Sequence, residues 1–150
     1  MRIQQCRVCK SSNLQTIMDL GKRALTGIFP KPGEKVPTAP LKLMRCVDGC
    51  GLVQLADSYS PSEMYGENYG YRSGLNSSMV RHLREIVLKI EKTISFTTGD
   101  LVIDIGSNDG TTLSMFPEQV RRLGVDPTGN KFRKYYRPGI ELIPDFFLLS

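Results

Sequence analysis

The spacing of apolar residues predicts one long helix at residues 77–94, which precedes several predicted strands. Along residues 77–94 an apolar residue recurs every three or four positions, which predicts an amphipathic helix capped by Asn76 or Ser77. The apolar stripe of this helix would consist of Val80, Leu83, Val87, Ile90 and Ile94. His82, the only histidine of the chain, lies off that stripe. It is either an exposed helix residue or a candidate catalytic residue.

Short apolar runs after this helix predict strands at 101–105, 123–125 and 139–143, and the first should be buried. Between them the sequence predicts helices at 111–116, capped by Asn108 or Asp109, and at 130–137. Strands that alternate with helices predict an α/β fold with a doubly wound parallel sheet. Three such strands make only half of that sheet, so we expect the front part of a longer protein.

The N-terminal segment carries four cysteines in two short-spaced pairs, Cys6 with Cys9 and Cys46 with Cys50. Each pair can place two thiolates on one side of a tetrahedral Zn²⁺, so we predict a structural zinc site that uses all four. Strands are predicted at 41–44 and 51–55, and the proline-rich stretch between the pairs should be mostly loop. Two disulfides or idle thiols are the alternative.

The composition of the chain limits the cellular compartment and the kinds of partner that we expect. The chain has 150 residues, 40% of them hydrophobic, which is enough for one domain or two small ones. It has no apolar run of ~18 residues, so no membrane span is predicted, and its start lacks the apolar stretch of a signal peptide. We therefore expect a cytoplasmic protein, in which metal binding is the commoner role for such cysteines. The net charge of +5 suits an anionic substrate but argues little for nucleic acid.

The turn after the strand at 101–105 carries candidate cofactor-binding residues. A dinucleotide site needs G-x-G-x-x-G, but Asn108 stands where its second glycine would be. An asparagine can hydrogen-bond a small zwitterion, and Asp126 ends the next strand about 20 residues later, where ribose-binding acids lie. The pattern fits S-adenosylmethionine better than NAD. An ordinary strand-to-helix turn, with Asp126 in a plain Asp-Pro turn, is the alternative. The predicted cofactor-binding residues are Asp104, Gly106, Ser107, Asn108, Asp109, Gly110 and Asp126.

Residues 59–76 are rich in tyrosine, glycine and serine, and they include Tyr69 and Tyr71. Aromatic hydroxyls on a loop suit contacts with a sugar or a nucleotide. A tyrosine-rich linker packed on its neighbours explains the same composition nearly as well.

Together these motifs resemble the zinc-containing, S-adenosylmethionine-dependent C-methyltransferases of nucleotide-linked deoxysugars. The motifs are Cys6-x-x-Cys9, Cys50-Gly-Leu-Val-Gln-Leu55, Tyr69-x-Tyr71-x-Ser73, Ile103-Asp-Ile-Gly-Ser-Asn-Asp-Gly110 and Gly124-Val-Asp-Pro127. The resemblance implies a zinc-binding domain at 1–58 and a tyrosine-rich linker or substrate loop at 59–76. Residues 77–150 would be the first half of a Rossmann-like class I methyltransferase domain.

The resemblance also implies methyl transfer from S-adenosylmethionine to a carbon of a nucleoside-diphosphate 4-keto-deoxysugar. Gly106, Asn108 and Asp109 would hold the methionine end of the cofactor and Asp126 its ribose. The catalytic candidates, as general base or substrate anchor, would be Tyr69, Tyr71 and His82. Such a partial enzyme should bind the cofactor weakly, if at all, and catalyse nothing by itself. A zinc-ribbon RNA methyltransferase with residues 131–137 on the RNA, and a non-enzymatic zinc-binding module, are the alternatives.

Overall fold

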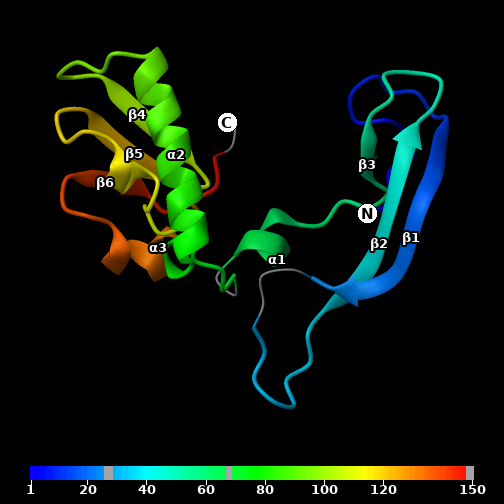
Figure 1. Cartoon of the computed structure of the whole chain (residues 1–150). Helices are drawn as coiled ribbons and strands as arrows, with labels where there is room; N and C mark the ends of the chain where they lie inside the picture. The colour runs from blue at the N-terminus through cyan, green and yellow to red at the C-terminus, as the bar shows by residue number, and fades with distance from the viewer. Residues whose placement is uncertain (26–28, 67–68, 148–150) are drawn as a thin grey trace. The chain divides into compact units, whose positions relative to one another are not determined.

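The computed structural model describes residues 1–25, 29–66 and 69–147 (Figure 1). The chain divides into two compact units, Met1–Met64 and Tyr65–Ser150, and each is described by itself. Residues 67–68 of the predicted tyrosine-rich loop and residues 148–150 lie outside the described ranges. None of the helices within these ranges combines the length and the apolar character that crossing a bilayer requires.

The first unit is an antiparallel sheet in the order β1–β2–β3 (Figure 1). Its strands are β1 (Leu14–Ala24), β2 (Thr38–Cys46) and β3 (Val53–Leu55). The last two confirm the strands predicted at 41–44 and 51–55. β2 starts earlier than expected and includes Pro40, which is tolerated because β3 pairs only with the end of β2, from Leu43 to Arg45. One turn of helix, α1 (Pro61–Tyr65), follows.

β1 corrects the prediction of a loop between the two cysteine pairs. Every residue of β1 after Leu14 is exposed, so its apolar residues give no one-sided pattern. Its register with β2 also shifts twice, between Thr16 and Met18 and between Asp19 and Lys22, which breaks the alternation further. A strand of this kind has no signature in the sequence.

The second unit contains a parallel sheet in the order β4–β5–β6, preceded by the long helix α2 (Ser77–Thr93) (Figure 1). The strands are β4 (Leu101–Ile105), β5 (Arg121–Val125) and β6 (Ile140–Ile143), and all three were expected from the apolar runs. Asn76 caps α2 by accepting a hydrogen bond from the N–H of Ser78. The α/β class is confirmed, whereas assignment of this sheet to the Rossmann-like class stays a prediction.

Two of the predicted helices are shorter in the structure. At 111–116 the chain forms only a 3₁₀ turn, η2 (Leu113–Met115). Asp109 accepts hydrogen bonds from the N–H and the hydroxyl of Thr111, and such local bonds compete with helix formation. At 130–137, α3 (Gly129–Phe132) passes into a second 3₁₀ turn, η3 (Arg133–Tyr135). A third, η1 (Ser73–Leu75), precedes α2.

The core of the second unit lies between α2 and one face of the sheet. Val87 of α2 forms a buried cluster with Phe116 and Val120. The other face of β4 is open, since Leu101, Ile103 and Ile105 are 45%, 49% and 58% exposed. The prediction of a buried strand is therefore wrong for half of β4. Successive side chains of a strand point to opposite faces, and the described elements cover only one of them.

Candidate zinc site and ligand cavity

All four cysteines meet in the first unit. Their Sγ atoms lie within 4.8 Å of one another, with Cys6 and Cys50 at 3.6 Å and Cys9 and Cys46 at 3.5 Å. Four thiolates ~2.3 Å from a tetrahedral Zn²⁺ would be roughly 3.8 Å apart, so small shifts would allow the cluster to hold the ion. The sulfurs are not joined as disulfides. The geometry supports zinc binding, and four protein ligands would leave no open position for catalysis.

Gly49, in the wider second cysteine pair, lies directly against the sulfur cluster. A Cβ atom at Gly49 would lie 2.7 Å from the Sγ of Cys9 and 2.8 Å from the Sγ of Cys46. Carbon and sulfur atoms do not approach so closely without a bond, so only glycine fits against the cluster.

The surroundings of the sulfurs affect their protonation differently. A hydrogen bond from the backbone N–H of Cys9 lowers the pKa of the Cys6 thiol to about 6, which favours the metal-binding thiolate. Burial raises the pKa of the Cys46 thiol to about 11. A divalent cation is therefore needed to keep all four sulfurs deprotonated at neutral pH, because metal binding displaces the remaining protons.

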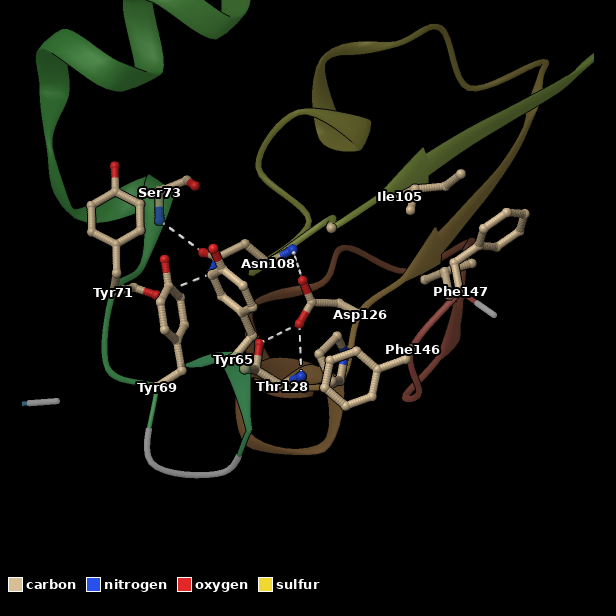
Figure 2. Close-up of a pocket in the computed structure, with 13 residues that line it drawn as sticks. Tyr65, Tyr69, Tyr71, Ser73, Ile105, Asn108, Asp126, Thr128, Phe146 and Phe147 are labelled. Atoms are coloured by element: carbon tan, nitrogen blue, oxygen red, sulfur yellow. Dashed lines mark hydrogen bonds between the residues drawn. The ribbon is translucent and has the colours of Figure 1, made fainter. Parts of the chain in front are cut away.

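A cavity of about 470 Å³ opens in the second unit at the C-terminal ends of β4 and β5 (Figure 2). Its volume lies within the range of ligand pockets, and parallel α/β sheets bind their ligands at this end. Three of the predicted cofactor-binding residues line it: Gly106, Asn108 and Asp126. The other lining residues are Tyr65, Tyr69, Tyr71, Ser73, Ile105, Val125, Pro127, Thr128, Phe146 and Phe147.

Asp126 supports the turn after β4. The φ angle of Asn108 is +52°, in the left-handed region that few residues other than glycine adopt. The N–H of Asn108 donates to Asp126 Oδ2 at 2.8 Å, and the N–H and hydroxyl of Thr128 donate to Asp126 Oδ1 (Figure 2). A carboxylate can accept about four hydrogen bonds, so Asp126 retains about one lone pair for a ligand.

The Asn108 side chain holds a neighbouring segment against this turn. That segment, residues 71–75, is called the strap below. The N–H of Ser73 donates to Asn108 Oδ1 at 2.9 Å, and Asn108 Nδ2 donates to the carbonyl of Tyr71 at 3.0 Å (Figure 2). Both polar ends of the side chain are therefore engaged by the protein itself. Asn108 thus shapes the cavity wall, and one lone pair of Oδ1 and one hydrogen of Nδ2 remain for a ligand.

Asp109 holds the strap from the other side. Its carboxylate is buried, accepts a hydrogen bond from the N–H of Gly74 at 2.9 Å, and lies 3.3 Å from Arg72 Nε, an ion pair without hydrogen-bond alignment. The guanidinium of Arg72 in turn lies 3.7 Å from the ring centroid of Tyr135. Asp109 is not among the described residues that line the cavity, so any effect of it on a ligand there is indirect.

Ser107, Gly110 and Asp104 also lie outside the lining of the cavity, as far as the structure describes it. Ser107 Oγ and the Tyr136 hydroxyl are 2.7 Å apart, and that hydroxyl donates to the carbonyl of Asn108 at 3.0 Å. Burial raises the pKa of Tyr136 to about 12, so it stays a neutral donor. Burial, together with the charge of Asp126, raises the pKa of Asp104. Sequence patterns give no sign of the supporting role of Tyr136.

The structure brings two of the three catalytic candidates to the cavity. Tyr69 and Tyr71 line it, with ring centroids 6.5 Å apart. Burial raises the pKa of Tyr69. His82 is exposed on α2 and is not one of the lining residues that the structure describes. The lining residues Phe146 and Phe147 were not predicted as ligand-binding residues. They directly follow the third predicted strand, at the end where such sheets bind ligands.

Residues 131–137, the candidate RNA-binding segment, present few free aromatic faces. Phe132 is buried, and the Tyr136 hydroxyl bonds to the turn after β4. Tyr135 is 42% exposed, but Arg72 lies over one face of its ring. Stacking of unpaired bases needs exposed rings. This arrangement does not favour the RNA methyltransferase alternative.

Comparison with known proteins agrees with the geometry of the first unit. Residues 6–65 match the family model described as "Putative zinc binding domain". The chain is also similar to C-methyltransferase NovU from Streptomyces niveus, with 31% identity over 151 aligned residues. The alignment covers 97% of this chain and 35% of that protein, so the chain spans little more than a third of the length of this curated relative. The two findings confirm the resemblance to the zinc-containing C-methyltransferases that the motifs indicate.

Proposed function

We propose that this chain is the zinc-containing, cofactor-binding part of an S-adenosylmethionine-dependent C-methyltransferase that acts on a nucleoside-diphosphate 4-keto-deoxysugar. The observation that carries the proposal is the cavity where Gly106, Asn108 and Asp126 meet at the ends of two parallel strands. The similarity to a C-methyltransferase supports it. In this proposal Cys6, Cys9, Cys46 and Cys50 hold a structural Zn²⁺, and the second unit begins a Rossmann-like domain.

The lining of the cavity suits the parts of the cofactor. The remaining lone pair of Asp126 can accept a hydrogen bond from a ribose hydroxyl, and the ring of Phe146 offers a flat apolar surface for adenine. Gly106 has no side chain, so a ligand can approach the backbone closely there. Asn108 and Asp109 would act by holding the strap and the turn in place.

Bound S-adenosylmethionine would supply an electrophilic methyl group. The residues of this chain would bind the cofactor and orient a substrate next to it. Tyr69 would donate a hydrogen bond rather than act as a base, because burial raises its pKa and keeps the phenol protonated at neutral pH. Tyr71, which is 37% exposed at the cavity, would anchor the substrate. His82 would reach only a substrate that extends beyond this cavity.

Calorimetric titration with S-adenosylmethionine tests the proposal. We expect weak, saturable binding at one site per chain. Asp126→Asn should weaken it roughly tenfold or more, because a hydrogen bond to a charged group contributes about 1.5–3 kcal/mol. Asp126→Asn should weaken the binding of adenosine by a similar factor, because adenosine keeps the ribose that Asp126 is proposed to contact. Thermal unfolding would verify that the variant is folded.

Glu118→Gln is the matched control, since it removes an exposed carboxylate of the same unit that does not line the cavity. It should leave the affinity unchanged. No binding of the cofactor, or equal affinities of the wild type and Asp126→Asn, would contradict the proposal.

A further inference from the structure

A second cavity of the second unit adjoins the strap. Its volume is about 390 Å³, near the lower end of the range of ligand pockets, roughly 300–1,000 Å³. The strap contributes to both cavities, because Ser73 lines the first and the next residue, Gly74, lines the second. The remaining lining residues of the second cavity are Val80, Arg84, Thr111, Ser114, Met115, Tyr135 and Arg137.

The charge in this lining has one sign. Arg84 comes from α2 and Arg137 from the segment before β6, and no carboxylate is among the lining residues that the structure describes. Neither guanidinium forms an ion pair with an acid of the described residues. Arg137 Nη1 makes one long hydrogen bond, 3.5 Å, to the carbonyl of Ser114. Most of the donors on both arginines are therefore left for a ligand.

The hydroxyls of Thr111 and Ser114, which also line this cavity, are already used within the protein. The Thr111 hydroxyl donates to Asp109, and the Ser114 hydroxyl donates to the carbonyl of Thr111. Asp109 itself is engaged by Gly74, Thr111 and Arg72. A ligand in this cavity would thus meet two guanidinium groups as its main polar partners, with Lys134 beside the Tyr135 ring at 5.1 Å adding positive potential.

We propose that the second cavity binds a phosphate or diphosphate group between Arg84 and Arg137. The planar guanidinium presents its N–H donors in a fork that matches two phosphate oxygens, and two such forks suit an anion with several oxygens. The lining does not suit a cation, which would meet positive charge and no acid. If the substrate is nucleotide-linked, its diphosphate would occupy this site; that step alone rests on the proposed function.

Calorimetric titration with inorganic pyrophosphate tests the site. Arg84→Gln and Arg137→Gln should each weaken binding at least fivefold, and the double variant should abolish it. Both side chains are exposed, so these substitutions leave the core intact. The matched controls are Arg81→Gln, on the same helix, and Arg133→Gln, both exposed and outside the lining. The controls should bind as the wild type does, and binding should weaken as salt is raised.

A parallel titration with a nucleoside diphosphate distinguishes the source of the phosphate. If the nucleoside diphosphate binds more tightly than pyrophosphate and its binding depends on the same two arginines, the ligand is a nucleotide. If the two affinities are equal, the site binds free phosphate. Absence of pyrophosphate binding, or equal losses in the control variants, would overturn the site. Titration of the double variant with S-adenosylmethionine keeps the two proposals separate, because that affinity should not change.

Discussion

The two units of the chain are stabilised in different ways. Among the described residues, the buried apolar side chains of the first unit are Cys6, Met44, Cys46 and Ala56, so two of the four belong to the metal site. The second unit buries a conventional apolar set: Val87, Leu113, Phe116, Val120, Val125 and Phe132. We therefore expect the first unit to depend on an ion for its fold and the second to fold without one.

The two units also differ in the polar side chains that they bury. The first unit buries Gln54, whose Oε1 accepts hydrogen bonds from the backbone and the guanidinium of Arg7, while its Nε2 has no partner among the described residues. The second unit buries Asn108, Asp109 and Asp126 around one turn and one cavity. Buried polar networks are costly unless satisfied, and they rigidify their surroundings when they are. This difference fits the proposal that the second unit binds the ligand and the first unit has a structural role.

The largest expected effect is the loss of the zinc site. Cys9→Ser should unfold the first unit and leave the second folded, because structural zinc binding contributes about 10–16 kcal/mol and little other core is present. Native mass spectrometry should show one Zn²⁺ per wild-type chain and none in the variant. Val8→Ser, at an exposed position between two ligands, is the control and should keep the ion. A folded first unit in metal-free Cys9→Ser would refute the dependence on zinc.

Phe116→Ala should destabilise the second unit and leave the first unit folded. It removes a buried ring that packs edge-on against Phe96 at 5.7 Å, and such truncations cost about 3–5 kcal/mol. We expect the thermal transition of the second unit to be lowered or lost while zinc stays bound. Leu88→Ala, on the exposed side of α2, should change little. Loss of zinc from Phe116→Ala would mean that the units do not fold independently.

A smaller effect is expected where Asn108 holds the strap. Asn108→Gly removes both hydrogen bonds to the strap, and it avoids strain because glycine accepts a φ of +52°. Amide hydrogen exchange at Ser73 should become roughly tenfold faster, since each lost bond contributes about 1 kcal/mol. Protection within β4 should persist. Unchanged exchange at Ser73 would show that the Asn108 side chain does not hold the strap.

The smallest effect concerns Asp104. Because burial raises its pKa in the folded state, the folded protein binds the proton more tightly than the unfolded chain does. Stability should therefore fall as the pH rises from the ordinary pKa of an aspartate through the raised one. Asp104→Asn should remove this part of the pH dependence in thermal unfolding of the second unit, and Glu118→Gln should retain it. An identical pH profile in Asp104→Asn would contradict the effect of burial.

The sequence predicts those parts of the fold that depend on local pattern. α2 has a one-sided apolar stripe, β4, β5 and β6 are short apolar runs, and the cysteine spacing indicates the metal cluster. β1 escapes prediction because its side chains are exposed on both faces and its register is irregular. The helix expected at 111–116 is reduced to a 3₁₀ turn, where Asp109 bonds to Thr111 instead of capping a helix.

Prediction of the candidate site was limited by contacts that are distant in the sequence. Gly106, Asn108 and Asp126 could be named from their places after two strands. That Asn108 binds the strap, through residues 35 and 37 positions away, could not, because side-chain partners across such separations have no periodic signature. The two arginines of the second cavity likewise come from segments that only the folded chain brings together.

The difference between the two units is tested most directly by removing the metal while every residue is observed. A ¹H–¹⁵N correlation spectrum of the chain is recorded before and after a zinc chelator is added, and again after zinc is restored. We expect the amide signals of Met1–Met64 to collapse to unfolded positions and to return with zinc, while the signals of residues 69–147 remain dispersed. Dispersed signals from the first unit without metal, or collapse of both units together, would contradict the account.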